Sequence, residues 1–542
     1  MKKSDDKNNE LFPNMPETEL VSSSIDRRSF IIRNAVIGAA AVMTGRVWTT
    51  EARAAQAAKE ATTKEAGKAA PLTPQHSLTL NVEKQSKEPV MIVADEFYKV
   101  GPGPSSSHTI GPMRITYDFY QRCTKLAANQ LSKATGLKVH LFGSLSATGK
   151  GHGTERACLA GLLGKEPATV DPLFLDEMKE KPDQTYPLKL GDKTYNLSLA
   201  DVVYDATKGN FPHANTMTCK LMAGDKSIFE LEYYSVGGGF IEWKGYTPPK
   251  KGEPKYPYGT MKELRQHAEK NNLSIAQVIM ANEIAVSGKT EEQVNVFLDK
   301  IGNAMLATVK SGLSVKEGVL PGPIKLQSKA ATVWQRAQDD KYEADRALGL
   351  LSACALAASE ENARGHLVIT APTGGSAGVM PAVVYGLVNG KKQVPMEKIR
   401  EGLLAGLAIG YLCKHNATLA AAEGGCQSEI GVASAMAAAM LAQVLDSSPQ
   451  VIENAAESAL EHHLGMTCDP VAGYVQVPCI ERCAFGAVKA WTACMIATNE
   501  IASRHRVDLD TTIKTLADTG KDMSAKYKET SEAGLAQNLT LC

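Results

Sequence analysis

Two kinds of hydrophobic pattern divide the chain. Apolar and polar residues alternate in 137–142 and again in 228–236, and a period of two is typical of strands with one buried face. Between Gly111 and Thr135 the apolar residues instead recur at helical spacing, up to a stop at Gly136. Strand and helix signals mixed in this way predict an α+β domain, which we place at residues 89–246.

Beyond a predicted linker at residues 247–260, nearly every segment has helical character. Two capping boxes begin predicted helices: Ser274-Ile-Ala-Gln277 and Thr290-Glu-Glu-Gln293. The alanine-rich runs Ala433–Val444 and Ala484–Ala502 are apolar almost all round, which is typical of buried central helices. We therefore predict a mostly all-α domain at residues 261–542.

The bulk composition excludes several classes of protein. Among 542 residues, 59 Lys and Arg balance 59 Asp and Glu, so no charge field favours nucleic acid. Eleven cysteines are too sparse, and odd in number, for a disulfide scaffold. Lys489, Glu500 and Arg504 interrupt the long apolar runs, and the mean hydropathy is −0.18, so we predict no stable membrane span.

The N-terminal segment, residues 1–54, resembles a twin-arginine export signal. Asp26-Arg-Arg-Ser-Phe-Ile31 precedes a mildly apolar stretch, 35–43, that is too short to span a bilayer, and Ala52-Arg-Ala54 offers a small-x-small cleavage site. We expect a periplasmic protein if this signal is used and a cytoplasmic one otherwise. The alternative is a dispensable disordered extension. Residues 55–88 are predicted to be a linker.

Three cysteines form the strongest chemical signal, with a fourth at the last residue. Cys426, Cys468 and Cys479 lie beside glycine or proline, where irregular backbone can direct a thiolate inward, and Cys542 ends the sequence. The spacing matches neither the paired cysteines of zinc sites nor a ferredoxin run. Taken alone, it is also compatible with ordinary buried thiols.

Two blocks rich in glycine and hydroxyl groups lie in the α+β region. The first, 101–109, ends in Ser105-Ser106-Ser107-His108-Thr109 before a predicted helix; its serines can cap that helix or donate to a carboxylate. The second, 143–154, is predicted to be a loop that carries His152, and it lacks the phosphate-loop spacing. Each histidine is a candidate base or a structural residue.

The sequence motifs around the cysteines resemble those in the catalytic domain of iron–sulfur-dependent L-serine dehydratases of the single-chain type. They are Glu423-Gly-Gly-Cys-Gln-Ser-Glu-Ile-Gly, Met466-Thr-Cys-Asp-Pro-Val and Gln476-Val-Pro-Cys-Ile-Glu-Arg. The resemblance covers roughly residue 90 to the end. It implies a [4Fe-4S] cluster on Cys426, Cys468 and Cys479, with the fourth iron left for substrate or, at rest, for Cys542. It also implies a homodimer.

The resemblance implies a lyase of amino-acid degradation that converts L-serine to pyruvate, a precursor for gluconeogenesis, and ammonia. A base must take the α-proton, and a Lewis acid must assist the leaving hydroxide. The candidate bases are His108 and His152, and the candidate carboxylate binders are Ser105, Ser106, Ser107, Thr373 and Ser376. Gly374 stands where the family usually has asparagine, which leaves L-cysteine and L-threonine open as substrates. A third alternative is an exported serine-binding protein without catalysis.

Overall fold

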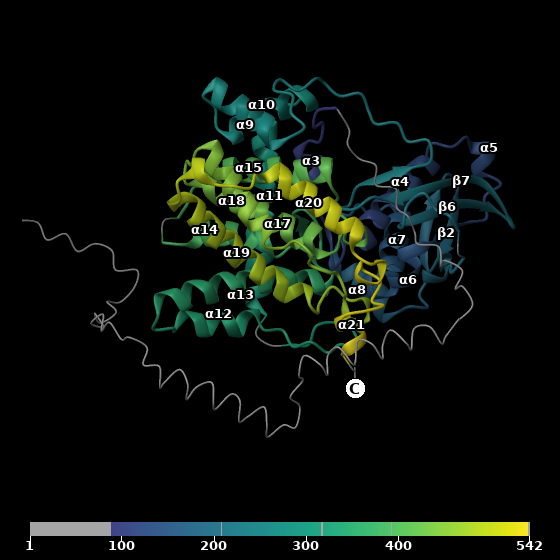
Figure 1. The fold of residues 1–542 in the computed structure, drawn as a ribbon. Coiled ribbons are helices and arrows are strands. Elements are labelled where there is room, and N and C mark those ends of the chain that lie inside the picture. The colour runs from purple at the N-terminus through teal and green to yellow at the C-terminus, as the bar shows by residue number, and fades with distance from the viewer. Residues whose placement is uncertain (1–87, 208, 316–317, 392, 540–542) are drawn as a thin grey trace, which may run out of the picture. The chain divides into compact units, whose positions relative to one another are not determined.

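The computed structural model describes residues 88–207, 209–315, 318–391 and 393–539. The twin-arginine-like segment and Cys542 lie outside the described residues. The described chain contains an α+β region followed by a mostly helical region, as predicted (Figure 1).

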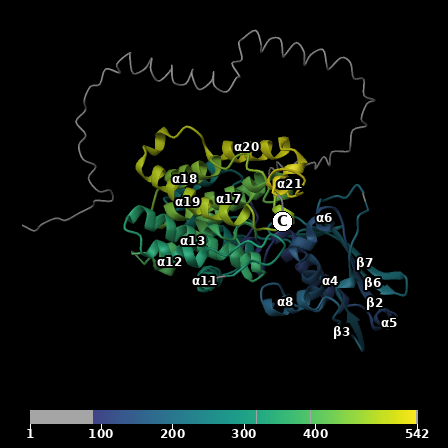
Figure 2. The same cartoon turned by 90° about the horizontal axis from the view of Figure 1, so that it is seen from below.

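A five-stranded sheet is the centre of the α+β region. Its strand order is β5-β2-β6-β7-β8; β2 and β5 are parallel and the other neighbours are antiparallel. Figure 2 shows β2, β6 and β7 side by side with α4, which packs against β6, β7 and β8. The elements are α4 (Gly111–Cys123), α5 (Ala128–Leu131), β2 (Gly136–Leu141), α6 (Gly143–His152), α7 (Thr154–Leu162), α8 (Pro172–Glu180), β3 (Tyr186–Leu190), β4 (Lys193–Leu197), β5 (Val202–Tyr204), β6 (Thr216–Ala223), β7 (Lys226–Ser235) and β8 (Ile241–Trp243).

Both predicted strands are confirmed as β2 and β7, but two other local predictions are wrong. The helix predicted over 111–135 divides into α4 and the short α5, because turns after Cys123 interrupt it. The predicted loop at 143–154 is helical and forms α6 and the start of α7. Its glycines lower helix propensity, but packing of α6 against neighbouring elements overrides that weak preference.

A two-stranded sheet joins segments far apart in the sequence. Strand β1 (Lys99–Pro102) pairs antiparallel with β9 (Leu367–Thr370), with Lys99 opposite Thr370. The serine-rich block follows β1, as the π-helical turn η1 (Ser106–Ile110), and the block that contains Thr373 follows β9. The pairing therefore anchors both predicted substrate-binding blocks in one sheet.

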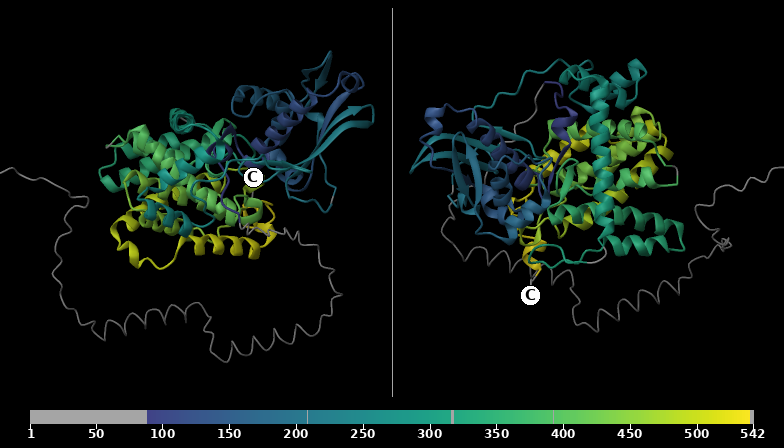
Figure 3. Two further views of the ribbon diagram at one scale, coloured as in Figure 1. Left: turned by 90° about the horizontal axis from the view of Figure 1, so that it is seen from above. Right: turned by 180° about the vertical axis from the view of Figure 1, so that it is seen from behind.

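The helical region surrounds one central helix. Every residue of α17 is buried, in agreement with its apolar sequence, and α17 packs against α14, α15, α18 and α19 (Figures 1 and 2). Figure 3 shows the long α11 as a teal helix in its right-hand view. The helices are α9 (Met261–Asn271), α10 (Ile275–Ser287), α11 (Glu291–Ser314), α12 (Ala330–Gln338), α13 (Glu343–Arg364), α14 (Val379–Asn389), α15 (Met396–Asn416), α16 (Ala421–Gly424), α17 (Ile430–Val444), α18 (Pro449–Glu461), α19 (Cys479–Asn499), α20 (Leu509–Asp522) and α21 (Leu535–Asn538).

The two regions have separate hydrophobic cores. Buried side chains of α4, α7 and the sheet form one core, and the helices form the other. Helix α3 (Ala94–Phe97) precedes the sheet in sequence, but Phe97 and Tyr98 belong to the helical core. Both capping boxes are confirmed at the starts of α10 and α11. Within the described residues, no helix combines the length and apolarity that a membrane crossing requires.

Candidate metal centre and active site

Three of the predicted cysteines meet at one point. The Cys426 thiol interacts with the thiols of both Cys468 and Cys479, and all three side chains are at most 5% exposed. The ligand atoms of Cys426, Glu429 and Cys468 all lie within 4.8 Å of one another. The fold therefore brings together side chains that are 42 and 11 residues apart in the sequence.

Each cysteine is directed inward by irregular backbone or a helix end. Gly425 precedes Cys426 with φ of +75°, and a β-carbon there would lie 2.7 Å from the Met466 carbonyl oxygen, so only glycine fits. Cys468 lies in extended chain, where its N–H donates to the Tyr527 carbonyl at 2.8 Å. Cys479 is the first residue of α19.

One cation faces the thiols. Arg482, one turn along α19, interacts with Cys426, pairs with Asp469 at 3.6 Å and donates to the Thr467 carbonyl at 2.5 Å. Hydrogen bonds from the other two cysteines, with help from Arg482, lower the pKa of the Cys426 thiol. Negative charge is therefore stabilised on Cys426, whereas the hydrogen bonds to Cys426, followed by burial, raise the pKa of Cys468 and Cys479.

A cavity of about 250 Å³ opens beside the thiols. The helical region supplies most of its wall, but Ser105 comes from the α+β region. The lining residues are Ser105, Gly375, Glu429, Cys468, Pro470, Val475, Cys479 and Glu529. Thiols, two carboxyl groups and a hydroxyl group thus share one small space, which fits a polar ligand of a few atoms.

The other predicted carboxylate binders lie around Ser105 and are buried. Thr373 Oγ1 and Ser376 Oγ are 3.1 Å apart, and Thr373 also interacts with Glu429. Ser106 follows Ser105 in η1; a β-carbon at Gly374 would lie 2.8 Å from the Ser106 backbone nitrogen. This packing leaves no room for a side chain at Gly374. The local backbone therefore excludes an asparagine at this position.

His108 is fully buried behind the cavity wall. Its Nδ1 lies 2.8 Å from Ser107 Oγ, and its Nε2 lies 3.0 Å from Ser144 Oγ. Ser107 Oγ is in turn 3.3 Å from Ser105 Oγ, which reaches the cavity lining. Burial, followed by the nearby His152, holds the pKa of His108 well below its usual range, so the ring is neutral near pH 7.

His152 is stacked close to His108, with 4.6 Å between the ring centroids. Its Nδ1 is 2.9 Å from the Thr148 carbonyl oxygen, so Nδ1 carries the hydrogen and Nε2 has a lone pair. That Nε2 is buried and has no hydrogen-bond partner among the described residues. Burial lowers the pKa of His152 to about 4. Both histidines are thus neutral bases beside the site, although neither lines the cavity.

Sequence reasoning missed two carboxyl groups. Glu429 is three residues after Cys426, a spacing that could have indicated a further ligand. Glu529 has no such signal, because it reaches the cavity through a long-range contact: its N–H donates to the Cys468 carbonyl at 2.8 Å. Glu529 Oε1 lies 4.0 Å from His108 Nδ1. Burial, and next the charge of Cys426, raises the pKa of both carboxyl groups.

The C-terminal segment is held beside the second cysteine. Ser531 Oγ donates to the Pro470 carbonyl at 2.7 Å, and the Leu535 N–H donates to Asp469 at 2.5 Å. This anchors the described chain up to α21 against the loop that carries Cys468. Cys483, the extra thiol near the site, donates to the Gly375 carbonyl at 3.3 Å and is packed as a neighbour.

The donor set suits a metal centre bound by sulfur. Three thiols that converge in a buried site, with an arginine to offset their charge, match the preference of iron–sulfur clusters and zinc for soft thiolate ligands. Within the described residues the fourth neighbour is a carboxylate, Glu429, instead of a cysteine. The residues therefore fit a cluster with three cysteine ligands and one remaining position.

Comparison with known proteins gives consistent matches over most of the chain. The family model described as serine dehydratase beta chain matches residues 93–246, and that described as serine dehydratase alpha chain matches residues 270–536. L-serine dehydratase 2 of Escherichia coli is 40% identical over 462 residues, which are 83% of this chain and 100% of that protein. L-serine dehydratases of Haemophilus influenzae and Streptomyces coelicolor are 40% and 41% identical, over 82% of this chain and 99% of each protein.

Proposed function

The chain belongs to the serine dehydratase family, and from this premise we propose that it is a lyase that converts L-serine to pyruvate and ammonia. The observation that carries the proposal is the cavity in which the thiols of Cys468 and Cys479 and the hydroxyl of Ser105 line one wall. Removal of water requires help for a poor leaving group and a base for a weakly acidic proton. Groups suited to both tasks surround this cavity. The pyruvate formed would place the enzyme in serine degradation, where it supplies a precursor for gluconeogenesis.

We propose that Cys426, Cys468 and Cys479 hold a [4Fe-4S] cluster. When bound, the cluster supplies a Lewis acid at the iron without a core cysteine, where the substrate hydroxyl can be activated. Arg482 would offset the negative charge of the thiolates that hold the cluster, and Glu429 lies within 4.8 Å of the Cys426 and Cys468 thiols.

We propose Cys542 as a thiol ligand of the resting enzyme. The hydrogen bonds from Ser531 and Leu535, which hold the C-terminal segment beside Cys468, support this role. Deletion of Cys542 is expected to change the resting absorption spectrum while iron content stays constant. An unchanged spectrum would contradict this role.

The substrate carboxylate is proposed to bind to the hydroxyl groups that follow β1 and β9. Ser105 lines the cavity, and Ser106 and Ser107 continue its turn; Thr373 and Ser376 lie on the facing segment. These groups orient the α-carbon of serine toward the histidine side of the cavity.

Proton transfer is proposed to run through the hydroxyl groups to His108. Ser105 Oγ, Ser107 Oγ and His108 Nδ1 form a chain with steps of 3.3 and 2.8 Å. Neutral His108 can accept a proton along this chain, and the Glu529 carboxyl group, whose pKa burial raises to about 8, lies 4.0 Å away as a second group that can exchange a proton. His152, whose Nε2 is a buried lone pair, is the second candidate for the base.

The first test is anaerobic purification followed by iron and labile-sulfide analysis and a titration with L-serine. We expect a coloured protein with four irons per chain that releases pyruvate and ammonia in equal amounts. Sulfide from L-cysteine or 2-oxobutyrate from L-threonine, at rates above that with serine, would reassign the substrate. A colourless, iron-free protein that binds serine without turnover would support the exported binding protein instead.

Export through the twin-arginine pathway is proposed from Arg27 and Arg28, which lie outside the described residues. This pathway carries folded proteins, so a cofactor can be inserted before export. Replacement of both arginines by lysine is expected to keep the protein in the cytoplasm, as measured by fractionation of cells. Equal distribution of both forms would exclude a functional signal.

A homodimer is proposed for the assembly. Phe485, Met495 and Ile496 project from α19 and are 65%, 53% and 53% exposed, which leaves apolar area uncovered in the single chain. Light scattering on the purified protein is expected to give about twice the chain mass, and Phe485→Glu should lower that mass.

A further inference from the structure

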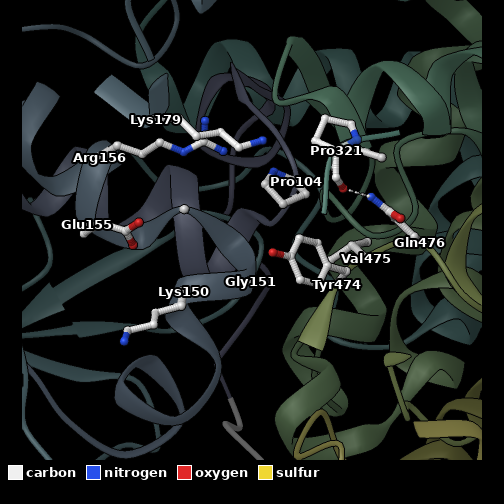
Figure 4. A pocket seen from close by; sticks show the side chains of 12 residues that line it. Pro104, Lys150, Gly151, Glu155, Arg156, Lys179, Pro321, Tyr474, Val475 and Gln476 are labelled. Carbon is white, nitrogen blue, oxygen red and sulfur yellow. Dashed lines mark hydrogen bonds between the residues drawn. The ribbon is translucent and has the colours of Figure 1, made fainter. Parts of the chain in front are cut away.

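A larger cavity lies next to the thiol-lined cavity. It has a volume of about 470 Å³ and lies between α6, α7 and α8 on one side and the segment before α19 on the other (Figure 4). Neither the candidate bases nor the cysteines line it. Its lining residues are Pro104, Lys150, Gly151, Gly153, Glu155, Arg156, Lys179, Pro321, Ala363, Tyr474, Val475 and Gln476.

Two cations extend into this space. The Arg156 and Lys179 side chains lie together and reach toward Pro104 in Figure 4. The Arg156 side chain is only 16% exposed, and among the described residues its polar contacts are long: Asp176 at 3.7 Å and the Leu175 carbonyl at 3.4 Å. Burial, and next the charge of Arg156, lowers the pKa of Lys179. A bound anion would relieve the repulsion between these two cations.

Asp176 and Glu180 partly offset the positive charge of Lys179, and the other charged residues that line the cavity are engaged elsewhere. Glu155 accepts a hydrogen bond from the Tyr204 hydroxyl, and Lys150 lies over the Tyr204 ring at 5.7 Å, so both turn away in Figure 4. On the opposite wall the Tyr474 hydroxyl points toward the cavity (Figure 4). The space between Arg156, Lys179 and Tyr474 therefore offers donors and positive charge.

Only a thin wall separates the two cavities. Val475 lines both of them, and Pro104 of the larger cavity is bonded directly to Ser105 of the smaller one. The neighbouring Gln476 donates to the Pro321 carbonyl at 2.6 Å, which fixes the segment beside Val475. A small molecule in the larger cavity is thus one side chain away from the thiols.

We propose that the larger cavity is a vestibule that binds small carboxylates through Arg156 and Lys179. The inference rests on the proposed function, because the ligands are then L-serine on its way in and pyruvate on its way out. The basic pair binds the carboxylate group of zwitterionic L-serine or of the pyruvate anion, and a shift of Val475 admits either molecule to the inner cavity. The carboxylate contacts in the vestibule are exchanged for the serine and threonine hydroxyls of the inner site.

The test compares Arg156→Met and Lys179→Met with Lys181→Met in the cluster-loaded enzyme. Lys181 follows α8, pairs with Glu177 and does not line the cavity. Lys181→Met is therefore the control, because it removes the same positive charge outside the cavity. For the two vestibule variants we expect KM for L-serine to rise roughly three- to tenfold with kcat within about twofold, because the lost cation binds the substrate carboxylate without taking part in the reaction. Their affinity for the pyruvate anion should also depend less on ionic strength than that of the wild type.

Product binding separates the two carboxylates. Calorimetric titration with sodium pyruvate should give a weaker affinity for Arg156→Met than for the wild type if the vestibule holds product. If only KM changes, the vestibule serves substrate alone. Arg156→Lys should recover most of the loss, which distinguishes charge from folding.

If Arg156→Met and Lys179→Met have the same KM, salt dependence and pyruvate affinity as the control Lys181→Met, the vestibule proposal is wrong. Failure of the wild type to form pyruvate from serine would instead contradict the proposed function, and the calorimetric titration would still test the vestibule.

Discussion

Two groups of residues near the thiol-lined inner cavity are buried: the thiols of Cys426, Cys468 and Cys479 (the thiol side) and the rings of His108 and His152 (the histidine side). The two sides differ in the hydrogen-bond partners of their polar atoms. On the histidine side, both ring nitrogens of His108 have hydroxyl partners within 3.0 Å. On the thiol side, Cys426, Cys468 and Cys479 have chiefly one another and Arg482. The histidine side is hydrogen-bonded as folded except at His152 Nε2, which has no partner among the described residues, whereas the thiol side gathers ligands that repel each other once they are deprotonated.

This difference indicates a division of labour. A site whose charged groups lack internal compensation is suited to bind a cation or cluster. A neutral, hydrogen-bonded histidine network is suited to accept a proton without rearranging. Removal of a group on the thiol side is therefore expected to lower iron content, and removal of a group on the histidine side is expected to lower turnover alone.

The largest effect is expected for Cys468→Ala. Loss of one thiolate should release iron and reduce turnover roughly a thousandfold or more, since Lewis-acid assistance contributes several kcal/mol. Iron analysis and the pyruvate assay measure both effects. Cys413→Ala, at a buried thiol of α15, is the control and should retain iron. Full iron content in Cys468→Ala would remove that cysteine from the ligand set.

His108→Gln should sharpen the comparison, because it leaves the thiols untouched. Iron content is expected to stay at the wild-type level, while kcat falls roughly 10²- to 10⁴-fold through loss of general-base catalysis. His140→Gln on β2, whose ring pairs with Asp205 at 3.2 Å, is the matched control. If both variants retain activity, His108 is structural and His152 becomes the preferred base.

The pH profile of the wild type gives a related check. Because burial lowers the pKa of His108, the base stays unprotonated to lower pH than a free histidine. The acid limb of kcat/KM is therefore expected below about pH 6.5. An acid limb well above that value would point to a different base.

A smaller effect is expected for Glu529→Gln, which joins the two sides. The amide keeps the size of the side chain but cannot exchange a proton with His108 across 4.0 Å. We expect kcat to fall roughly tenfold, because one proton-exchanging group of the site is lost. Iron content should not change. Glu532→Gln, exposed in the same segment, serves as the control; an equal loss there would mean that the segment as a whole matters.

The smallest effect on catalysis is expected for Glu283→Gln, in α10 of the helical region. Glu283 accepts from the Ala94 N–H at 2.9 Å and the Tyr411 hydroxyl at 2.7 Å, and burial raises its pKa to about 7. A carboxyl group with a raised pKa contributes stability below about pH 4.5, which is lost as pH rises through 7.

Chemical unfolding between pH 4.5 and 7.5 tests this contribution. The free energy of unfolding of the wild type should lose about 3 kcal/mol across that range relative to Glu283→Gln. Turnover at pH 7 should be nearly equal in the two proteins. Glu292→Gln, exposed at the start of α11, should retain the wild-type slope. Parallel profiles for wild type and Glu283→Gln would show that this carboxyl group is not the source.

Local patterns carried the parts of the fold that depend on neighbours in sequence. The alternation at β2 and β7, the capping boxes of α10 and α11 and the apolar run of α17 all became the predicted elements. The prediction failed at α6, because packing against other elements outweighed the poor helix propensity of its glycines. The domain boundaries remain predictions, as do the roles of the site residues.

The sequence by itself determined the class of fold and identified the three cysteine motifs and the two hydroxyl-rich blocks, because each of these is a short-range pattern of residue types. Only the tertiary structure decided that the serine-rich block and the block that contains Thr373 follow the paired strands β1 and β9, that Glu529 lies near His108 and that Arg156 and Lys179 line the larger cavity. These contacts join residues separated by tens to hundreds of positions. They arise from the packing of two hydrophobic cores, which no local pattern contains.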